Sequence, residues 1–468
     1  MGTMRHLLYF TLLMALGTAD TLGQKPDSVL PLRDALRIGL TNYSRLKTKQ
    51  DLVHASAMEV QAAKQDGLPD LTVGAESAYG TLDGMNGLAS GQPGLITLTS
   101  GPVAVTQNWN AAFGALYLTN INWNLFSFGL QRSHVAEAKG QYRQDQQDLA
   151  QEQFQQQVRV AGAYLSLLAA QRVRIAMEEN LRRAMQLREV ILERTVNGLN
   201  PGVDSSIANT EVSNARLSLI DAQNYEQTQD NQLCIQMGIS PQLLSVDTTF
   251  SLRPPGNLLS GTTPNVSGNP TLQFLASQVK TSDLQATYLR KTGLPRVSLF
   301  AVGQDRGSGF GSNYSINPAD YSNNFFHGLQ PVRANYLVGV GLAWDITDFS
   351  RSRSRSSAQR YRSKAFQDEY ELEQSKLVNQ LALSDQQIAN AMAKYNETPV
   401  QLRSAQDAYR QKEALYENGL NNIVEVTQTL FLLNRAEIDR DVACNAVWQA
   451  VLFKAGTAGD LNLFLQQF

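Results

Sequence analysis

The side chains that could carry chemistry are few, and they are not spaced for a reaction. The chain of 468 residues has four histidines, at positions 6, 54, 134 and 327, and two cysteines, Cys234 and Cys444. Protein ligands of a zinc ion come in close, regular spacing, which these residues lack. The sequence also has no Gly-x-x-x-x-Gly-Lys loop, no His-Glu-x-x-His helix and no Gly-x-Ser-x-Gly motif. We therefore expect no catalytic residue, no cofactor and no bound metal.

Two segments resemble binding motifs only superficially. Gly307-Ser308-Gly309-Phe310-Gly311 is rich in glycine, but its spacing is wrong for a dinucleotide loop and no helix is expected after it. A basic run lies further on, with arginines at 351, 353, 355, 360 and 362. Such a run could contact phosphates of nucleic acid or of lipid head groups, or it could be a solvated helix start. We favour a solvated start for this run, with lipid contact as the next choice.

Overall charge argues against a nucleic-acid partner. The chain has 40 basic and 42 acidic side chains, a formal net charge of -2. Phosphate binding needs a basic excess, which the chain lacks.

Hydrophobic residues make up 43% of the sequence, which is enough to bury a core. The two cysteines lie in segments that a duplication would place about 13 Å apart along equivalent helices, so we expect separate buried thiols.

The amino end predicts export. Arg5 and His6 precede an apolar run from Leu7 to Gly17, and small residues follow it. This pattern is typical of a secretory signal peptide, which we place at residues 1–24. Eleven helical residues span only about 16 Å, which is too short for a bilayer core. No later segment offers a transmembrane helix, whereas strands of about ten residues could still form a membrane β-barrel.

The sequence contains a repeat of about 221 residues, which indicates an ancient duplication. Four matches support it: Gly67-Leu68-Pro69 with Gly293-Leu294-Pro295, Trp123–Phe126 with Trp344–Thr347, Arg132-Ser133 with Arg353-Ser354, and Asn197-Gly198-Leu199 with Asn418-Gly419-Leu420. We assign a first repeat at 25–240, a linker at 241–268, a second repeat at 269–460 and a tail at 461–468. Each repeat reads as helix, strand, external loop, strand and a long helical pair.

The second strand of each repeat has one apolar face. Its alternate residues are Tyr117, Thr119, Ile121, Trp123 and Leu125, and at an offset of 221 Val338, Val340, Leu342, Trp344 and Ile346. The intervening positions are mostly polar or small. This alternation is typical of a membrane β-barrel with Trp123 and Trp344 at the lipid interface, and a soluble sandwich shows it equally. Four strands cannot close a barrel, so the chain must oligomerise if these are membrane strands; three chains would give twelve strands.

The helices are too long for an ordinary domain. No proline interrupts residues 127–174, and about 45 helical residues would reach about 68 Å. Apolar residues, many of them alanine, recur at steps of three and four, which is coiled-coil spacing. We place the turn of each helical pair near Arg174–Glu178 and near Asn396–Pro399, where Thr398 can cap a helix beginning at Pro399.

Taken in order, these features resemble the TolC family of outer-membrane channels. They include Leu32–Leu36, Trp123–Phe126 followed by Gly129, and a closing segment, Tyr416-Glu417-Asn418-Gly419 before Ile423–Val426. The resemblance implies a mainly α fold with a small β part. Duplicated long-helix hairpins of three chains would form a periplasmic α-barrel, and four strands per chain would build a twelve-stranded barrel in the outer membrane.

The same resemblance implies a function and partners. Such a homotrimer is the exit duct of a tripartite efflux pump or a type I secretion system. It docks on a periplasmic adaptor (membrane fusion) protein and an inner-membrane RND or ABC transporter, it is surrounded by outer-membrane lipid, and nucleic acid is not a partner. The alternative is an exported coiled-coil scaffold or adhesion protein with a small β-sandwich.

The family closes its duct at the periplasmic tip with acidic side chains. The residues that the resemblance suggests for this constriction are Glu397, Asp407, Glu178 and Glu179. A ring of carboxylates from three chains would attract cations. Ordinary surface charge is the competing interpretation, and ion pairs with neighbouring arginines, such as Arg174 and Arg182, are another.

Overall fold

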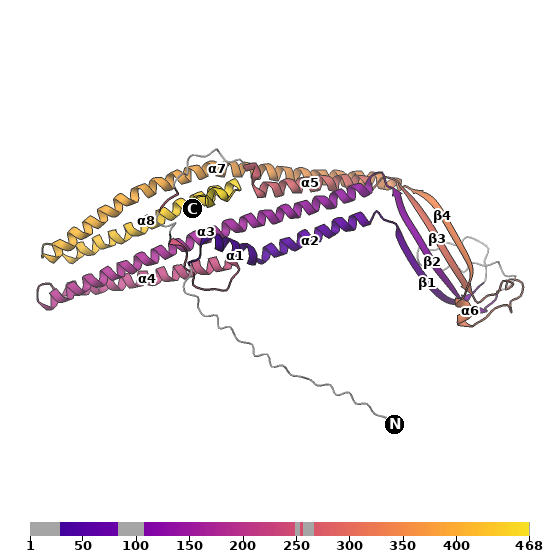
Figure 1. Cartoon of the computed structure of the whole chain (residues 1–468), viewed down its shortest axis with the longest axis horizontal. Coiled ribbons are helices and arrows are strands. Elements are labelled where there is room, and N and C mark those ends of the chain that lie inside the picture. The colour runs from indigo at the N-terminus through magenta and orange to yellow at the C-terminus, as the bar shows by residue number, and fades with distance from the viewer. Residues whose placement is uncertain (1–28, 83–106, 249–252, 256–265, 468) are drawn as a thin grey trace, which may run out of the picture.

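The computed structural model describes residues 29–82, 107–248, 253–255 and 266–467. The predicted signal peptide and most of the loop predicted between the first two strands lie outside these ranges. The molecule is elongated, with a four-stranded sheet at one end and two helical hairpins at the other (Figure 1). The mainly α fold with a small β part is confirmed.

The two halves of the chain have the same order of elements. The first half contains α1 (Leu32–Asn42), α2 (Ser44–Gln65), β1 (Asp70–Thr81), β2 (Ala111–Phe126), α3 (Leu130–Val196) and α4 (Gly202–Met237). The second contains η2 (Val266–Gly268), α5 (Pro270–Lys291), β3 (Arg296–Ser308), α6 (Phe325–Leu329), β4 (Pro331–Ala343), α7 (Ile346–Glu417), α8 (Ile423–Ala458) and α9 (Asn462–Leu465). Thus α2-β1-β2-α3-α4 corresponds to α5-β3-β4-α7-α8.

The helix expected at the start of the first repeat is divided into two helices, α1 and α2. Tyr43 adopts an extended conformation (φ −65°, ψ 110°) that separates α1 from α2. The end of α4 packs against this break. Gly238, in the left-handed conformation, lies so close to Asn42 that a Cβ atom on it would be 3.1 Å from the Asn42 carbonyl oxygen. The break therefore belongs to the junction of α1 with α4.

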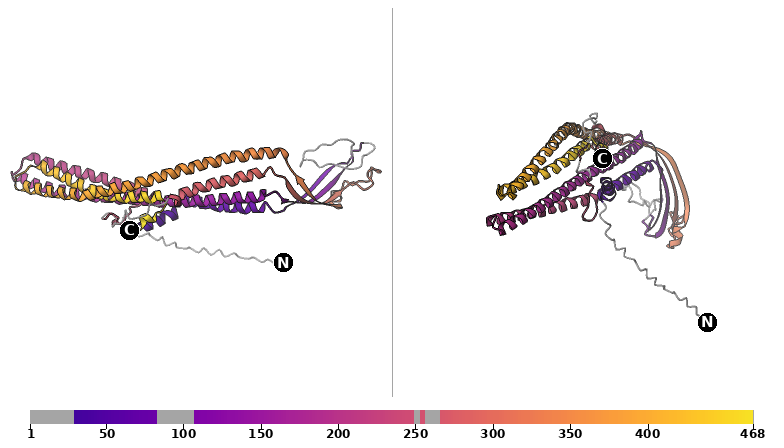
Figure 2. Two further views of the ribbon diagram at one scale, coloured as in Figure 1. Left: turned by 90° about the horizontal axis from the view of Figure 1, so that it is seen from above. Right: turned by 60° about the vertical axis from the view of Figure 1, so that its left-hand side comes forward.

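The four strands form one antiparallel sheet in the order β1-β2-β3-β4. Residues directly opposite each other share a face of such a sheet. Ile121 lies opposite Leu71 and Ala301, and Ala301 lies opposite Val338. This register extends the predicted apolar row across all four strands. The sheet is curved, and the long helices continue from it (Figure 2).

The helices are longer than predicted, and the predicted turns are wrong. α3 has 67 residues and α7 has 72, so each reaches about 100 Å. Both helices run through the expected turns at 174–178 and 396–399. Pro399 has no N–H to donate to the Tyr395 carbonyl, as another residue at this position of α7 would. The Thr398 hydroxyl donates to that oxygen instead, at 2.8 Å, so the helix tolerates the proline.

The true turns lie at the Asn-Gly-Leu repeats. Gly198 and Gly419 both have φ of +72°, a left-handed conformation that favours glycine. Behind each glycine, the leucine N–H bonds the carbonyl five residues earlier, Leu199 to Arg194 and Leu420 to Leu415. This arrangement occurs at both turns and is the Schellman motif that ends a helix. The distal ends of the two hairpins are therefore residues 197–201 and 418–422.

The two larger apolar clusters join the hairpins to each other and to the shorter helices. Midway along the molecule, α1, α3, α4, α8 and α9 meet around fully buried Tyr164, whose hydroxyl donates to Leu30 O at 2.8 Å and accepts from Asp247 N. Toward the distal turns, the α3–α4 and α7–α8 hairpins pack on each other through a second cluster. Small apolar residues of α4 at steps of three and four, Ala208, Val212 and Ala215, are buried there. Close helix approach is what these small residues permit.

The junction of helix and strand is the same in both halves. The Trp123 indole N–H donates to Gly67 O at 3.1 Å, and the Trp344 indole N–H donates to Gly293 O at 3.2 Å. Each tryptophan thus ties the end of the second strand to the Gly-Leu-Pro turn that begins the first. The two glycines differ in their surroundings. A Cβ on Gly293 would meet the Ser352 side chain at 2.2 Å and the α7 backbone at Phe349 at 2.9 Å. One on Gly67 would meet only the Gln131 side chain.

We therefore expect Gly293→Ala to lower stability by about 1–3 kcal/mol, because the backbone of α7 must shift to make room. Gly67→Ala should cost less than about 1 kcal/mol, since the Gln131 side chain, which donates to Ala63 O, has to shift only slightly. Thermal melting of the purified protein in detergent measures both variants. Equal losses for the two would contradict the assigned difference in packing.

Candidate functional site

The sheet is the first of two regions that form the candidate functional site, because one of its faces is apolar and the other is polar. The apolar face includes Val338, Val340 and Leu342, which are 63%, 63% and 72% exposed. The other face includes Asn120, Asn122 and Asn124. On that polar face, the ring of Phe300 lies against Gly339, where a Cβ atom would be 2.5 Å from it. Close packing against the Phe300 ring therefore explains why the β4 residue at this position, Gly339, is a glycine.

The edges of this sheet are open. β1 pairs only with β2, and β4 pairs only with β3, over the strands that the structure describes. A β4 of 13 residues thus presents unpaired backbone groups along one side, beside large exposed apolar side chains. Backbone groups left unpaired in lipid cost several kcal/mol each. Such an edge requires pairing with a further strand.

The second half of the site is the distal end of the helical hairpins. Arg194 of α3 reaches the other hairpin, where its Nη1 donates to Glu417 O at 2.5 Å and its guanidinium lies 5.6 Å from the Tyr416 ring centre. Asn200 Nδ2 donates to the Tyr416 hydroxyl at 2.5 Å. Burial and the nearby carboxylate of Asp204 raise the pKa of Tyr416, so its hydroxyl keeps its proton. We call Arg194, Asn200, Glu417 and Tyr416 the distal latch.

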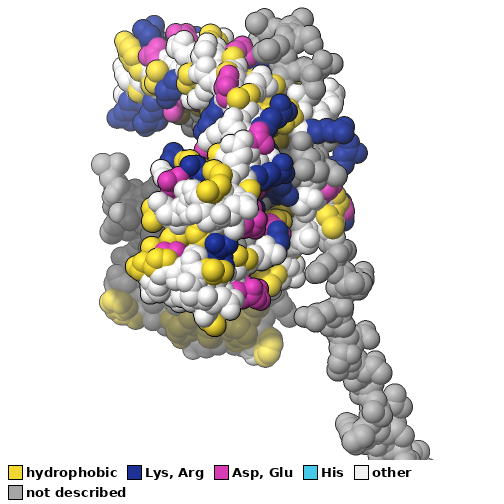
Figure 3. Space-filling view, turned by 90° about the vertical axis from the view of Figure 1, so that its left-hand side faces the viewer, with side chains coloured by type: hydrophobic (Ala, Val, Ile, Leu, Met, Phe, Trp, Pro, Cys, Tyr) yellow, Lys and Arg dark blue, Asp and Glu magenta, His cyan; other side chains and the backbone are white. Residues whose placement is uncertain are grey.

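Further ion pairs join the same hairpins above the latch. Arg183 of α3 donates to both carboxylate oxygens of Glu437 in α8, at 3.1 and 2.7 Å, and Arg172 donates to Asp441 at 3.0 Å. These groups are mostly shielded from water, so the pairs are stronger than exposed ones. Viewed from the distal ends, blue and magenta side chains are interspersed with hydrophobic ones (Figure 3).

The four acidic residues suggested for a constriction lie within helices, away from the distal turns. Glu397 is 20 residues before the end of α7, or about 30 Å, and Asp407 about 15 Å. Glu178 pairs with Arg174 at 2.5 Å, and Glu179 pairs with Arg182 at 2.8 Å. All four are exposed. The structure therefore does not gather them at the tip, and sequence reasoning missed the distal latch because its partners are 223 residues apart.

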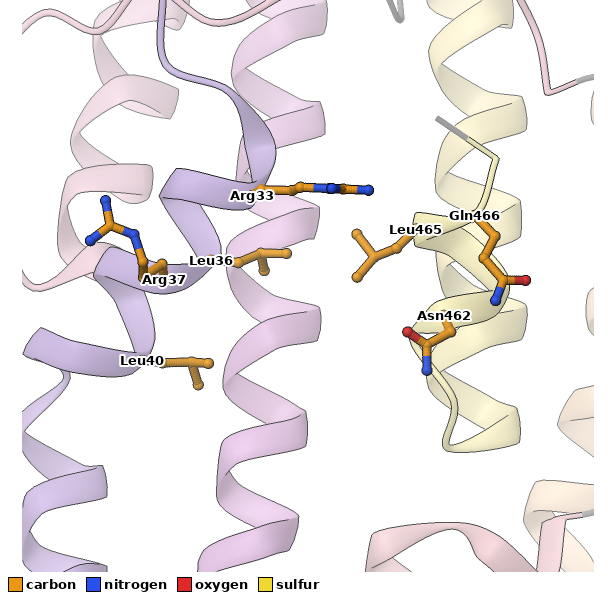
Figure 4. Close-up of a pocket in the computed structure, with 7 residues that line it drawn as sticks. All are labelled: Arg33, Leu36, Arg37, Leu40, Asn462, Leu465 and Gln466. Atoms are coloured by element: carbon orange, nitrogen blue, oxygen red, sulfur yellow. The ribbon is translucent and has the colours of Figure 1, made fainter.

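Little else in the described part of the chain suggests chemistry. A groove of about 570 Å³ lies between α1 and α9, lined by three leucines, two arginines and two amide residues: Arg33, Leu36, Arg37, Leu40, Asn462, Leu465 and Gln466 (Figure 4). Within the described ranges, no three His, Cys, Asp or Glu side chains come together as a metal site. No disulfide joins Cys234 to Cys444, and burial raises the pKa of the Cys444 thiol to about 11.

No helix in the described part of the chain has both the length and the apolar character needed to cross a membrane.

The sequence matches the family model described as outer membrane efflux protein over residues 40–238 and 266–450. The chain belongs to the outer membrane efflux protein family. This is a family of channels, and its members lie in the outer membrane with a long periplasmic part. The resemblance to TolC-type channels noted in the sequence is thereby confirmed. No curated protein is similar enough in sequence to be matched.

Solved channels have the same fold as this outer membrane efflux protein. VceC of Vibrio cholerae superimposes with a TM-score of 0.70 at 16% identity, with 92% of this chain and 96% of VceC covered. The CmeC channel of Campylobacter jejuni gives a TM-score of 0.74 at 11% identity, with coverage of 92% and 85%. MtrE of Neisseria gonorrhoeae, solved as an open state, gives 0.70 at 14%, with coverage of 92% and 89%.

The two faces of the sheet can be tested on one strand. Val338→Asp would place a charge on the apolar face of β4 and should abolish insertion into the outer membrane, because a charge in lipid is costly. Asn335→Asp, three residues earlier on the polar face, should insert normally. Fractionation of membranes from expressing cells measures both. The assignment of faces fails if the two variants partition alike.

A buried carboxylate in α4 predicts a pH dependence. Asp230 is 4% exposed and accepts from Leu244 N at 3.2 Å. Burial, opposed by that hydrogen bond, together with the charge of Glu226, raises the pKa of Asp230 from 3.8 to about 6. The folded state therefore holds this proton more tightly than the unfolded state does. The contribution of protonated Asp230 to stability is fully present below pH 4 and is lost as the pH rises through 6.

We expect Asp230→Asn to stabilise the outer membrane efflux protein at pH 7 by about 2 kcal/mol, because the amide oxygen still accepts from Leu244 and no buried charge is needed. At pH 4 the variant and the parent should melt alike. Thermal melting at both values of pH makes the comparison. A gain that is independent of pH would show that ionisation of Asp230 is not its cause.

Proposed function

We propose that this protein is a passive exit duct, in which three copies join their sheets into one wall around water. The observation that carries the proposal is the sheet itself. It has one apolar face, one polar face and two unpaired edges, and only further copies of the same strands satisfy all three features at once. Twelve strands suffice for a closed membrane barrel. The long helices would extend the duct through the periplasm.

The distal turns supply a surface for a periplasmic partner. Leu199 and Val203 in the first half are 67% and 61% exposed, and their counterparts at an offset of 221, Leu420 and Val424, are 75% and 56% exposed. Equivalent apolar side chains exposed at both turns suit contact with another protein. We propose that a periplasmic adaptor docks there, and that an inner-membrane RND or ABC transporter supplies the energy.

The distal latch gives the duct a means of opening. It joins the α3–α4 hairpin to the α7–α8 hairpin where both end, next to the apolar cluster that packs them together, so its release would loosen the hairpins at their ends. Such a combination of cation–π contact and charge-assisted hydrogen bonds contributes about 1–3 kcal/mol. That is enough to hold the end closed and small enough for a docked adaptor to overcome.

Of the proposed constriction residues, two fit a lining role better than the others. Glu178 and Glu179 are engaged by arginines of their own helix. For Glu397 and Asp407, no ion pair is found among the described residues. We propose that these two carboxylates of α7 face the water of the helical duct and favour cations there.

The experiment is conductance in a planar lipid bilayer. The purified protein should form ion-conducting pores that close for part of the time. Arg194→Gln combined with Tyr416→Phe should raise the ratio of open to closed time about tenfold, because the latch no longer opposes separation of the hairpins.

Arg188→Gln is the matched control, since Arg188 bonds Asn209 within its own hairpin at 2.6 Å. That variant should gate as the parent does. A preparation that inserts and never conducts would refute the duct, whereas unchanged gating in the latch variant would refute only the latch.

A further inference from the structure

Two arginines lie side by side on the polar face of the sheet. The register of β3 and β4 sets Arg306 directly opposite Arg333. Arg306 in turn lies opposite Leu116, and Leu116 lies opposite Glu76, so all four side chains share one row. Their parity along the strands is that of Asn120 and Asn122, which assigns the row to the polar face. The pair lies two residues from the outer end of each strand of the hairpin.

Such a pair is unfavourable unless something compensates it. Like charges directly opposite each other on neighbouring strands destabilise a sheet. Both arginines are exposed, and the nearest polar contact of Arg306 is a long one, from Nη2 to Gln304 Oε1 at 3.5 Å. Among the described residues, neither guanidinium forms an ion pair. Elsewhere many arginines do, as Arg172, Arg174 and Arg183 show.

Closing the sheet into a barrel with neighbouring copies does not remove the excess of positive charge in this row. The row contains one carboxylate and two guanidinium groups per chain. In a closed ring, β4 must pair with β1 of a neighbouring copy, so the partner's Glu76 could at best meet Arg333. One guanidinium per chain would still lack a carboxylate on the wall. Three copies would therefore leave three cationic groups in excess at this level of the barrel.

We propose that Arg306 and Arg333 form an anion-binding pair on the inner wall of the duct, near its external end. The proposal rests on the duct function. Guanidinium groups donate in a fixed fork that fits the oxygens of a carboxylate or a phosphate, and rings of arginine favour anions in pores. The pair would bind the carboxylate or phosphate groups of exported solutes and draw them past the polar wall toward the exterior.

The test measures block of the ion current in a planar bilayer. Inorganic pyrophosphate and, separately, citrate are added on the side of the strand loops, and the concentration that halves the current is recorded. If the pair binds both phosphate and carboxylate groups, pyrophosphate and citrate should each block the parent channel. In Arg306→Gln/Arg333→Gln the half-blocking concentration should rise at least about tenfold, because two charge-assisted contacts are lost. Unitary conductance at low anion concentration confirms that this variant is folded.

Arg296→Gln is the matched control, since Arg296 lies on the same polar face of β3 but opposite Ala343. It removes one positive charge per chain without touching the pair, and its half-blocking concentration should stay within about twofold of the parent value. Each single variant, Arg306→Gln or Arg333→Gln, should shift the block more than Arg296→Gln does.

Three results would overturn the proposal. A parent channel that conducts and is blocked by neither anion has no such site. A block that persists in the double variant places the anion elsewhere, and a shift in Arg296→Gln equal to that of the double variant reduces the effect to total charge. A parent protein that does not conduct would instead refute the duct function itself.

Discussion

The unpaired backbone along β1 and β4 is the constraint from which the rest of the architecture follows. Hydrocarbon offers no partner for an amide N–H or a carbonyl, so a short sheet with an apolar face cannot remain open in lipid. In the part of the chain that the structure describes, the sheet has four strands, and closure therefore depends on further copies of it. Oligomerisation is, on this argument, a condition for membrane insertion and not an addition to a finished fold.

The duplication adapts this sheet to its helices. Trp123 and Trp344 bond the glycine carbonyls of two equivalent turns, so each pair of strands joins its helices in the same way. A wall that passes from strand to helix at constant spacing needs such repeated junctions. The repeat is nevertheless not uniform, because Gly293 is crowded by α7 whereas Gly67 meets only a flexible side chain. The two halves have the same design and different packing.

Length and polarity distinguish the helical part from a compact core. α3 and α7 extend about 100 Å, and their apolar residues gather into clusters with polar stretches between them. Ion pairs such as Arg183–Glu437 connect the hairpins in the stretch that leads to the distal turns. These pairs are mostly shielded from water, so they hold the hairpins together more strongly than exposed pairs would. Toward the distal turns the hairpins are therefore joined by polar contacts as well as by an apolar cluster.

The sequence by itself determined the duplication, the alternating strands, the long helices and the family. Each of these depends on local pattern: period two in Tyr117–Leu125, steps of three and four in Ala208–Ala222, and an offset of 221. It misplaced the end of the second hairpin, because a proline normally stops a helix, and only the side-chain geometry shows that the Thr398 hydroxyl bonds the Tyr395 carbonyl.

Only the tertiary structure decided which distant residues meet. Arg194 reaches Tyr416, and Trp123 reaches Gly67, across separations that no local pattern encodes. Strand register placed Arg306 opposite Arg333, since a shift of one residue would have set them on opposite faces. Pattern fixes the face that a side chain occupies along its own element. The partner across from it depends on how the elements pack.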